Sequence, residues 1–179
     1  SAAIQARITH TASATRYITL TGATGSNNPT ISTSAGALAL GNGQLQFPAT
    51  QNASADANTL DDYREASATL TATGMTTSPT GTAYFVKTGG MVNMEIPFIT
   101  GTSNATTFTL TGIPTAFRPN GDTNVVCITS DNSGSYAVSR GTINSSGVIT
   151  LYSNVGGGAF TASGTKIVQQ CTVTYQIHA

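Results

Sequence analysis

The sequence predicts an all-β fold, an antiparallel two-sheet sandwich of jelly-roll type that follows an extended β-rich stem. Threonine, a β-branched residue that suits a pleated surface, is the most frequent residue in the chain. Apolar side chains alternate with hydroxyl side chains in about eight short runs that turn residues separate, as in sandwich domains. No long segment has the 3.6-residue spacing of an amphipathic helix.

Residues 1–59 are expected to form an N-terminal stem and trimerisation region. The stretch "TRYITLTG" alternates, but the residues after it mix turn signals with isolated large apolar side chains. Ordering one residue costs about 1–2 kcal/mol of backbone entropy, and a buried Leu or Ile returns only about 1.5–3 kcal/mol. The segment is therefore disordered, docked on the second half or completed by other chains. Its regular Gly and Asn punctuation favours completion by other chains.

Charge is densest in "TLDDYREAS", and we interpret residues 60–67 as a structural junction. Hydrolysis of sugars by paired carboxyl groups needs them about 5–9.5 Å apart across a substrate. The side chains of Asp61 and Asp62 diverge in a strand or in a helix because they are neighbours in sequence. A Thr three residues before Asp62 matches a helix start, and Asp61 with Arg64 is spaced for a local ion pair. We expect one helical turn here, with Tyr63 packing inward.

Residues 68–179 are expected to form the C-terminal β-sandwich domain. Leu70 alternates with threonines in the first strand. The next two strands, residues 82–88 and 91–99, are joined by Gly89-Gly90, a pair favoured in tight hairpins. Pro97 lacks an N–H group for the ladder, which predicts an edge or a bulge. One face of the second hairpin strand carries Val92, Met94, Ile96 and Phe98.

The later strands follow the same alternation. "TFTLTG" places Phe108 and Leu110 inward, and "NVVCITS", "YAVSRGTIN" and "VITLYS" follow it. The cysteines, Cys127 and Cys171, lie among β-branched residues, and we expect them to be free thiols that act as small buried hydrophobes, with a disulfide between them as the alternative. In the last strand, "TKIVQQCTVTYQI", Ile167, Cys171, Val173, Tyr175 and Ile177 share one face, with Val168 on the other.

Composition argues against several classes of function. Only 8% of the residues are charged and the formal net charge is zero, whereas nucleic-acid binding needs clustered Lys and Arg. No apolar run is long enough for membrane insertion by a helix. The two histidines lie at opposite ends of the chain, and no Cys or His pair has metal-ligand spacing. The sequence lacks a nucleophile elbow and a phosphate-binding loop. We therefore expect no enzyme activity, no metal and no cofactor.

A glycan-binding surface is the functional alternative that is harder to exclude: aromatic, amide and hydroxyl side chains lie together in or beside the late loops, although the chain has no Trp, which weakens the case. The competing interpretation is that these aromatic residues pack the core, as most do. The candidate glycan- or receptor-binding residues are Asn132, Tyr136, Asn144, Tyr152, Asn154 and Phe160.

A resemblance to a known family agrees with this interpretation. The stretch "LQFPATQNASADANTLDDYREASATLTATG" resembles a junction found in tail fibres and tailspikes of tailed phages, where a C-terminal β-sandwich follows. "GTAYFVKTGGMVNMEIPFITG" is similar to the hairpin that comes next in that family. The chain departs from the family at Arg64-Glu65-Ala66, where Glu-Glu-Gly is usual. The junction carries no catalytic residue in the family, so none is assigned here.

The resemblance implies a homotrimeric bacteriophage virion protein at the tail or capsid surface. Its expected function is attachment to the host cell by non-covalent binding, with a host surface polysaccharide or another receptor as the partner. The first alternative is a structural virion component, such as a head fibre, decoration or neck protein, that contacts other virion proteins. The second is a glycan-cleaving activity at a subunit interface.

Overall fold

The computed structural model describes residues 6–9, 17–21, 30–33 and 63–177. The chain divides into two compact units, Ser1–Gln46 and Phe47–Ala179. In the first unit, three short strands form an antiparallel sheet in the order β1-β2-β3. The alternating "TRYITLTG" stretch supplies the middle strand. The predicted end of the stem at residue 59 lies outside the described residues. The strands are β1 (Ala6–Thr9), β2 (Tyr17–Thr21) and β3 (Thr30–Thr33).

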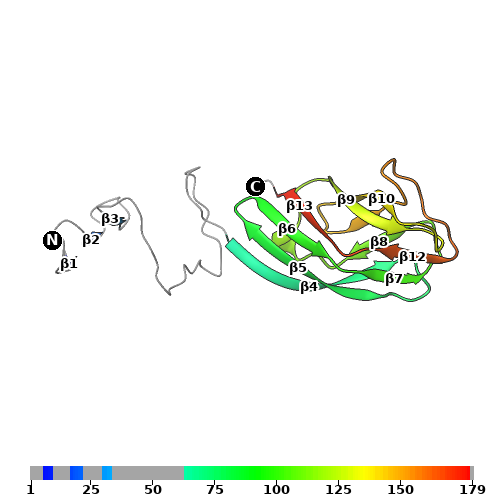
Figure 1. Ribbon diagram of the computed structural model, residues 1–179, viewed down its shortest axis with the longest axis horizontal. Coiled ribbons are helices and arrows are strands. Elements are labelled where there is room, and N and C mark those ends of the chain that lie inside the picture. The colour runs from blue at the N-terminus through cyan, green and yellow to red at the C-terminus, as the bar shows by residue number, and fades with distance from the viewer. Residues whose placement is uncertain (1–5, 10–16, 22–29, 34–62, 178–179) are drawn as a thin grey trace. The chain divides into compact units, whose positions relative to one another are not determined.

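The second unit is a curled antiparallel sheet of ten strands, so the all-β prediction is confirmed (Figure 1). The strand order is β13-β6-β5-β4-β8-β11-β10-β9-β12-β7. Within the described residues the one helical element is the 3-10 turn η1 (Thr115–Phe117). The strands are β4 (Tyr63–Thr73), β5 (Thr80–Thr88), β6 (Met91–Ile96), β7 (Ile99–Thr102), β8 (Phe108–Thr111), β9 (Thr123–Ser130), β10 (Ala137–Ile143), β11 (Ile149–Leu151), β12 (Thr165–Val168) and β13 (Cys171–Gln176).

Two bent strands close this sheet on itself. Only Pro97 and Phe98 separate β6 from β7, and only two glutamines separate β12 from β13. The β6–β13 ladder, with Ile96 opposite Cys171, continues in the same register in the β7–β12 ladder, with Ile99 opposite Val168. The two ladders are therefore one interrupted strand pair, and they join both ends of the strand order. The sequence predicted two facing sheets, whereas the structure has one continuous sheet wrapped around the core.

The break at Pro97 shifts the alternation of side chains by one residue. Ile96 and Pro97 are both buried, so Phe98 points outward and is 48% exposed. On the opposing strand, Lys166 and Val168 are buried and Ile167 is only half-buried. The predictions that Phe98 and Ile167 face inward and that Val168 faces outward were therefore wrong. The physical reason is that both strands change the side that faces the core at this break, although neither carries an extra residue, and such a change reverses a pattern of period two.

The junction prediction also needs correction where the structure describes it. From Tyr63 to Ser67 the chain is strand, because β4 pairs with β5 along this whole stretch. Tyr63 is 40% exposed rather than packed inward, and its hydroxyl donates a hydrogen bond to Glu65 on the same strand face. Arg64 lies 5.8 Å from the centre of the Phe117 ring. Residues 59–62, including the predicted partner of Arg64, lie outside the described residues.

Other strand predictions are confirmed. The β5–β6 hairpin turns through Gly89-Gly90 with Thr88 opposite Met91, and Gly89 has a φ of 56° that favours glycine. The two cysteines are free, Cys127 being buried and Cys171 half-buried. The core contains the side chains predicted to face inward from these strands, among them Leu70, Val92, Met94, Ile96, Phe108, Leu110, Val173 and Tyr175.

One buried residue was not expected from the sequence. Lys166 on β12 is fully buried, and its ammonium group donates to the backbone carbonyls of Gly74 (3.1 Å), Ala105 and Thr107 (2.7 Å). Burial lowers the pKa of Lys166. Its Nζ also lies 5.3 Å from the centre of the Phe160 ring. Through these hydrogen bonds Lys166 links two turns of the sheet to β12.

Candidate ligand-binding surface

The outward face of β9 and β10 is apolar where a solvent-facing strand would ordinarily be polar. Val126 is 66% exposed, Ile128 41% and Val138 58%. Ile128 lies directly opposite Val138, so these two side chains are cross-strand neighbours. By contrast, the exposed positions of β13 are Thr172, Thr174 and Gln176.

Arg140 and Tyr152 extend this face toward β11. Arg140 lies opposite Val126 on one side. On the other side, the Arg140 carbonyl accepts a hydrogen bond from the backbone N–H of Tyr152 at 3.0 Å. The three residues therefore form one row across the sheet. We call the set Val126, Ile128, Val138, Arg140 and Tyr152, together with Tyr136 just before β10, the β9–β10 surface.

The Arg140 guanidinium is held between an aromatic ring and a glycine loop. Its central carbon lies 4.4 Å from the centre of the Tyr152 ring, within the range of a cation–π contact. A Cβ atom on Gly157 would come within 2.4 Å of a terminal nitrogen of Arg140, and Gly157 has a φ of +88°. Glycine at position 157 therefore allows the loop backbone to lie directly against the charge.

The loop from Ser153 to Ala159 is ordered by its own hydrogen bonds. The Asn154 side chain accepts from the backbone N–H of Gly158 at 3.1 Å, and the Asn154 carbonyl accepts from Gly157 at 3.2 Å. Ser153 bonds Gly158 through its backbone N–H and Ala159 through its hydroxyl. The loop thus presents a defined backbone beside Arg140.

The Nε atom of Arg140 lacks an acceptor in the described part of the chain. It is shielded from solvent and has no hydrogen-bond partner there. Asp131 is engaged elsewhere, since its carboxylate accepts from the backbone N–H and the hydroxyl of Thr161. Glu95 accepts a hydrogen bond from Gln170 at 2.7 Å. The β9–β10 surface therefore carries a positive charge that neither of these carboxylates neutralises.

The structure brings together only part of the candidate set from the sequence. Tyr152 and Asn154 lie beside Arg140, and Tyr136 is 53% exposed at the start of β10. Asn144 follows the other end of β10, four residues and so about 13 Å along the strand from Arg140. There its side chain accepts from the backbone of the β10–β11 turn at 3.0 Å.

The two remaining candidates have structural roles in the described chain. Phe160 is only 3% exposed and packs edge-on against Phe108, with ring centres 5.4 Å apart. It belongs to the core and presents no ring face to solvent. Asn132 is exposed in the turn after β9 with a φ of 50°, a conformation that asparagine tolerates. A Cβ on Gly164 would collide with the Asn132 side chain, so the two loops are in close contact.

Sequence reasoning missed Arg140, Val126 and Val138. The stretch "YAVSRGTIN" contains an alternating pattern, but its two faces differ little in polarity, so alternation alone does not tell which one faces the core. A signal was nevertheless present: Val138 and Arg140 share a face that leads to Tyr136.

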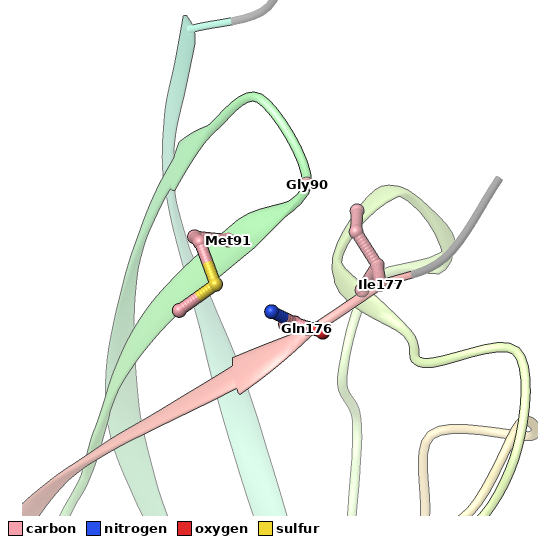
Figure 2. A pocket seen from close by; sticks show the side chains of 4 residues that line it. All are labelled: Gly90, Met91, Gln176 and Ile177. Carbon is pink, nitrogen blue, oxygen red and sulfur yellow. The ribbon is translucent and has the colours of Figure 1, made fainter.

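A hollow lies at the end of the β5–β6 hairpin, lined by Gly90, Met91, Gln176 and Ile177 (Figure 2). The backbone N–H of Ile177 donates to the Gly90 carbonyl at 2.8 Å. The lining offers a thioether and one side-chain amide but no charged group, so the β9–β10 surface is chemically the richer site. Among the described residues no group of three His, Cys, Asp or Glu is placed to hold a metal ion.

Comparisons with known proteins add little to this geometry. No family model and no curated protein matches the chain. One similar solved structure is a reovirus attachment protein, sigma1, in complex with alpha-2,3-sialyllactose, at 14% identity and a TM-score of 0.41. The match covers 90% of this chain and 96% of that chain. A likeness this low does not establish a shared fold, and no property of that protein is carried over. The described residues include no helix with the length and apolarity to span a membrane.

Proposed function

We propose that the chain is a homotrimeric phage virion protein that attaches the particle to the host cell by non-covalent binding of a surface glycan. The observation that carries this proposal is the β9–β10 surface. Aromatic rings, loop amides and an arginine whose Nε has no acceptor among the described residues lie together there on the sheet. Sugar recognition uses these groups, since an aromatic face packs on a sugar ring and polar groups fix its hydroxyls.

The sequence resemblance gives the setting for this activity. The "LQFPATQ" and "NTLDDY" segments resemble the junction of tail fibres and tailspikes, in which a stem carries a β-rich tip. In the proposed protein, three copies of the first unit form the stem, and each copy displays one curled sheet. The function is binding, and no catalytic step is assigned to any residue.

A glycan array with the purified full chain tests this proposal. We expect Tyr152→Ala to weaken binding about 30-fold, as removal of an interface aromatic hot spot costs about 2 kcal/mol or more. Tyr84→Ala is the matched control, because Tyr84 on β5 is 57% exposed and lies outside the β9–β10 surface. Equal loss in both variants, or binding that neither variant changes, would contradict the assignment.

A structural role in the virion is the second candidate, and the exposed aliphatic side chains favour it. Val126, Ile128 and Val138 form an apolar area that suits a protein contact as well as a ligand. Val126→Thr with Val138→Thr preserves β-branching and reduces apolarity. If the wild type binds no glycan and this double variant is no longer incorporated into particles, the structural candidate replaces attachment.

A further inference from the structure

We infer that the β9–β10 surface recognises an acidic glycan, and that Arg140 binds the carboxylate of its sugar acid. This inference rests on the function proposed above and names the class of ligand. Neutral sugars need no cation for recognition, so the charge on this surface calls for its own explanation. The surroundings of the Arg140 guanidinium supply that explanation.

The Arg140 guanidinium is partly removed from water without receiving an acceptor at Nε from the described residues. This Nε is shielded and unpartnered there, and the positive charge meets the face of the Tyr152 ring at 4.4 Å. Buried donors in folded proteins are nearly always paired, so this exception calls for an explanation. Because Nε is shielded, an external ligand meets the guanidinium at its terminal nitrogens, and a carboxylate fits these best because it accepts two parallel hydrogen bonds from the planar fork.

The neighbours of Arg140 favour an external carboxylate over one from the same domain. Asp131 and Glu95, two acids of the described domain, are hydrogen-bonded to other groups. The cross-strand neighbour of Arg140 is Val126, and its other flank is the Gly157 backbone. A ligand that approaches this face therefore meets a fixed cation with apolar and backbone walls. In this setting a charge-assisted hydrogen bond is strong.

The same geometry positions the sugar ring. Tyr152 holds Arg140 from one side, and Val126 and Val138 offer apolar surface alongside. A sugar acid presents a carboxylate on a ring with apolar C–H faces, so both parts of the ligand have a counterpart. A sulfated sugar presents a tetrahedral anion, for which the planar fork is less selective.

The test compares matched ligands on the full-length protein. The probes are oligogalacturonate chains and the same chains after chemical reduction of their carboxyl groups, which removes the charge and keeps the sugar backbone. We expect the wild type to bind the acidic form about 10- to 100-fold more tightly, the range for a charge-assisted pair. Arg140→Gln is expected to abolish this preference while weak binding of the reduced form persists. Arg140→Lys is expected to restore only part of the preference because lysine lacks the fork.

The outcomes separate the inference from the proposed function. If the wild type binds acidic and reduced chains equally, the carboxylate inference is overturned while glycan binding stands. If neither form nor any other glycan binds, the proposed function fails first. Equal affinity for poly-glutamate or for a sulfated oligosaccharide would also overturn the inference, since it would reveal unspecific attraction of anions. The comparison of the two chains on the wild type remains decisive even if the Arg140 variants do not fold.

Discussion

Replacement of Lys166 by methionine tests whether a buried ammonium group holds the turns of the curled sheet. Lys166 donates to the carbonyls of Gly74, Ala105 and Thr107. The first belongs to the turn after β4, and the other two precede β8. Methionine fills a similar volume with no donor, so all three carbonyls lose this partner in the variant.

The expected loss of stability follows from two opposing quantities. A hydrogen bond to a charged group contributes about 1.5–3 kcal/mol, so three of them amount to roughly 5–9 kcal/mol. Desolvation of the ammonium costs several kcal/mol, and methionine removes this cost. With this cost taken as about 3 kcal/mol, the net destabilisation is about 2–6 kcal/mol, which is large beside a total stability of about 5–15 kcal/mol for a domain.

Urea denaturation followed by circular dichroism measures this loss, with Lys87→Met as the control. Lys87 is a half-buried residue of β5, so the control makes the same chemical change away from the buried site. We expect the midpoint of Lys166→Met to fall well below those of the wild type and the control. A loss of less than about 1 kcal/mol would refute the argument, because ordinary substitutions already cost this much.

Three further predictions concern separate features of the domain. Burial raises the pKa of Tyr175 above its ordinary value of 10.0, so above pH 10 the unfolded chain releases a proton that the folded chain keeps. The free energy of unfolding should therefore fall with rising pH in the wild type more steeply than in Tyr175→Phe, and parallel curves would contradict this. A hydrogen bond between the two thiols lowers the pKa of Cys171 and raises that of Cys127, which is also buried. Iodoacetamide should label Cys171 first in the folded protein, as peptide mass spectrometry would show, and preferential labelling of Cys127 would count against the structure. Gly157→Ala places a Cβ against Arg140 and strains a positive φ. We therefore expect the free energy of unfolding in urea to fall by about 1 kcal/mol and the binding of acidic chains to weaken. Unchanged binding would show that the Gly157 loop is not part of the binding site.

Alternation along the chain predicted the strands well wherever one face was clearly apolar. The β5–β6 hairpin was predicted from Gly89-Gly90 and from the inward row of Val92, Met94 and Ile96, because all of these signals are local. Phe98 was predicted to face inward, whereas it turns outward at Pro97 together with a matching break in the opposing strand. That strand lies far away in the sequence, and the pattern of one strand does not reveal it.

The candidate site was harder to predict because it depends on exceptions to the usual distribution of polar residues to the surface and apolar residues to the core. A lysine in a strand is expected to face solvent, yet Lys166 is buried where carbonyls of two distant turns converge. Arg140 lies in a strand of ordinary composition, and its significance comes from Tyr152 and from an Nε without an acceptor among the described residues. Cross-strand register creates this arrangement, so the sequence indicated Tyr152 and not the cation beside it.

The central claim is that ligand binding takes place on the β9–β10 surface. Titration of the isotope-labelled chain with oligogalacturonate, followed by amide NMR shifts, tests it most directly. We predict that the largest shifts occur at Val126, Val138, Arg140 and Tyr152. Shifts concentrated instead around Gly90 and Gln176, at the hollow beside the β5–β6 hairpin, would contradict the account.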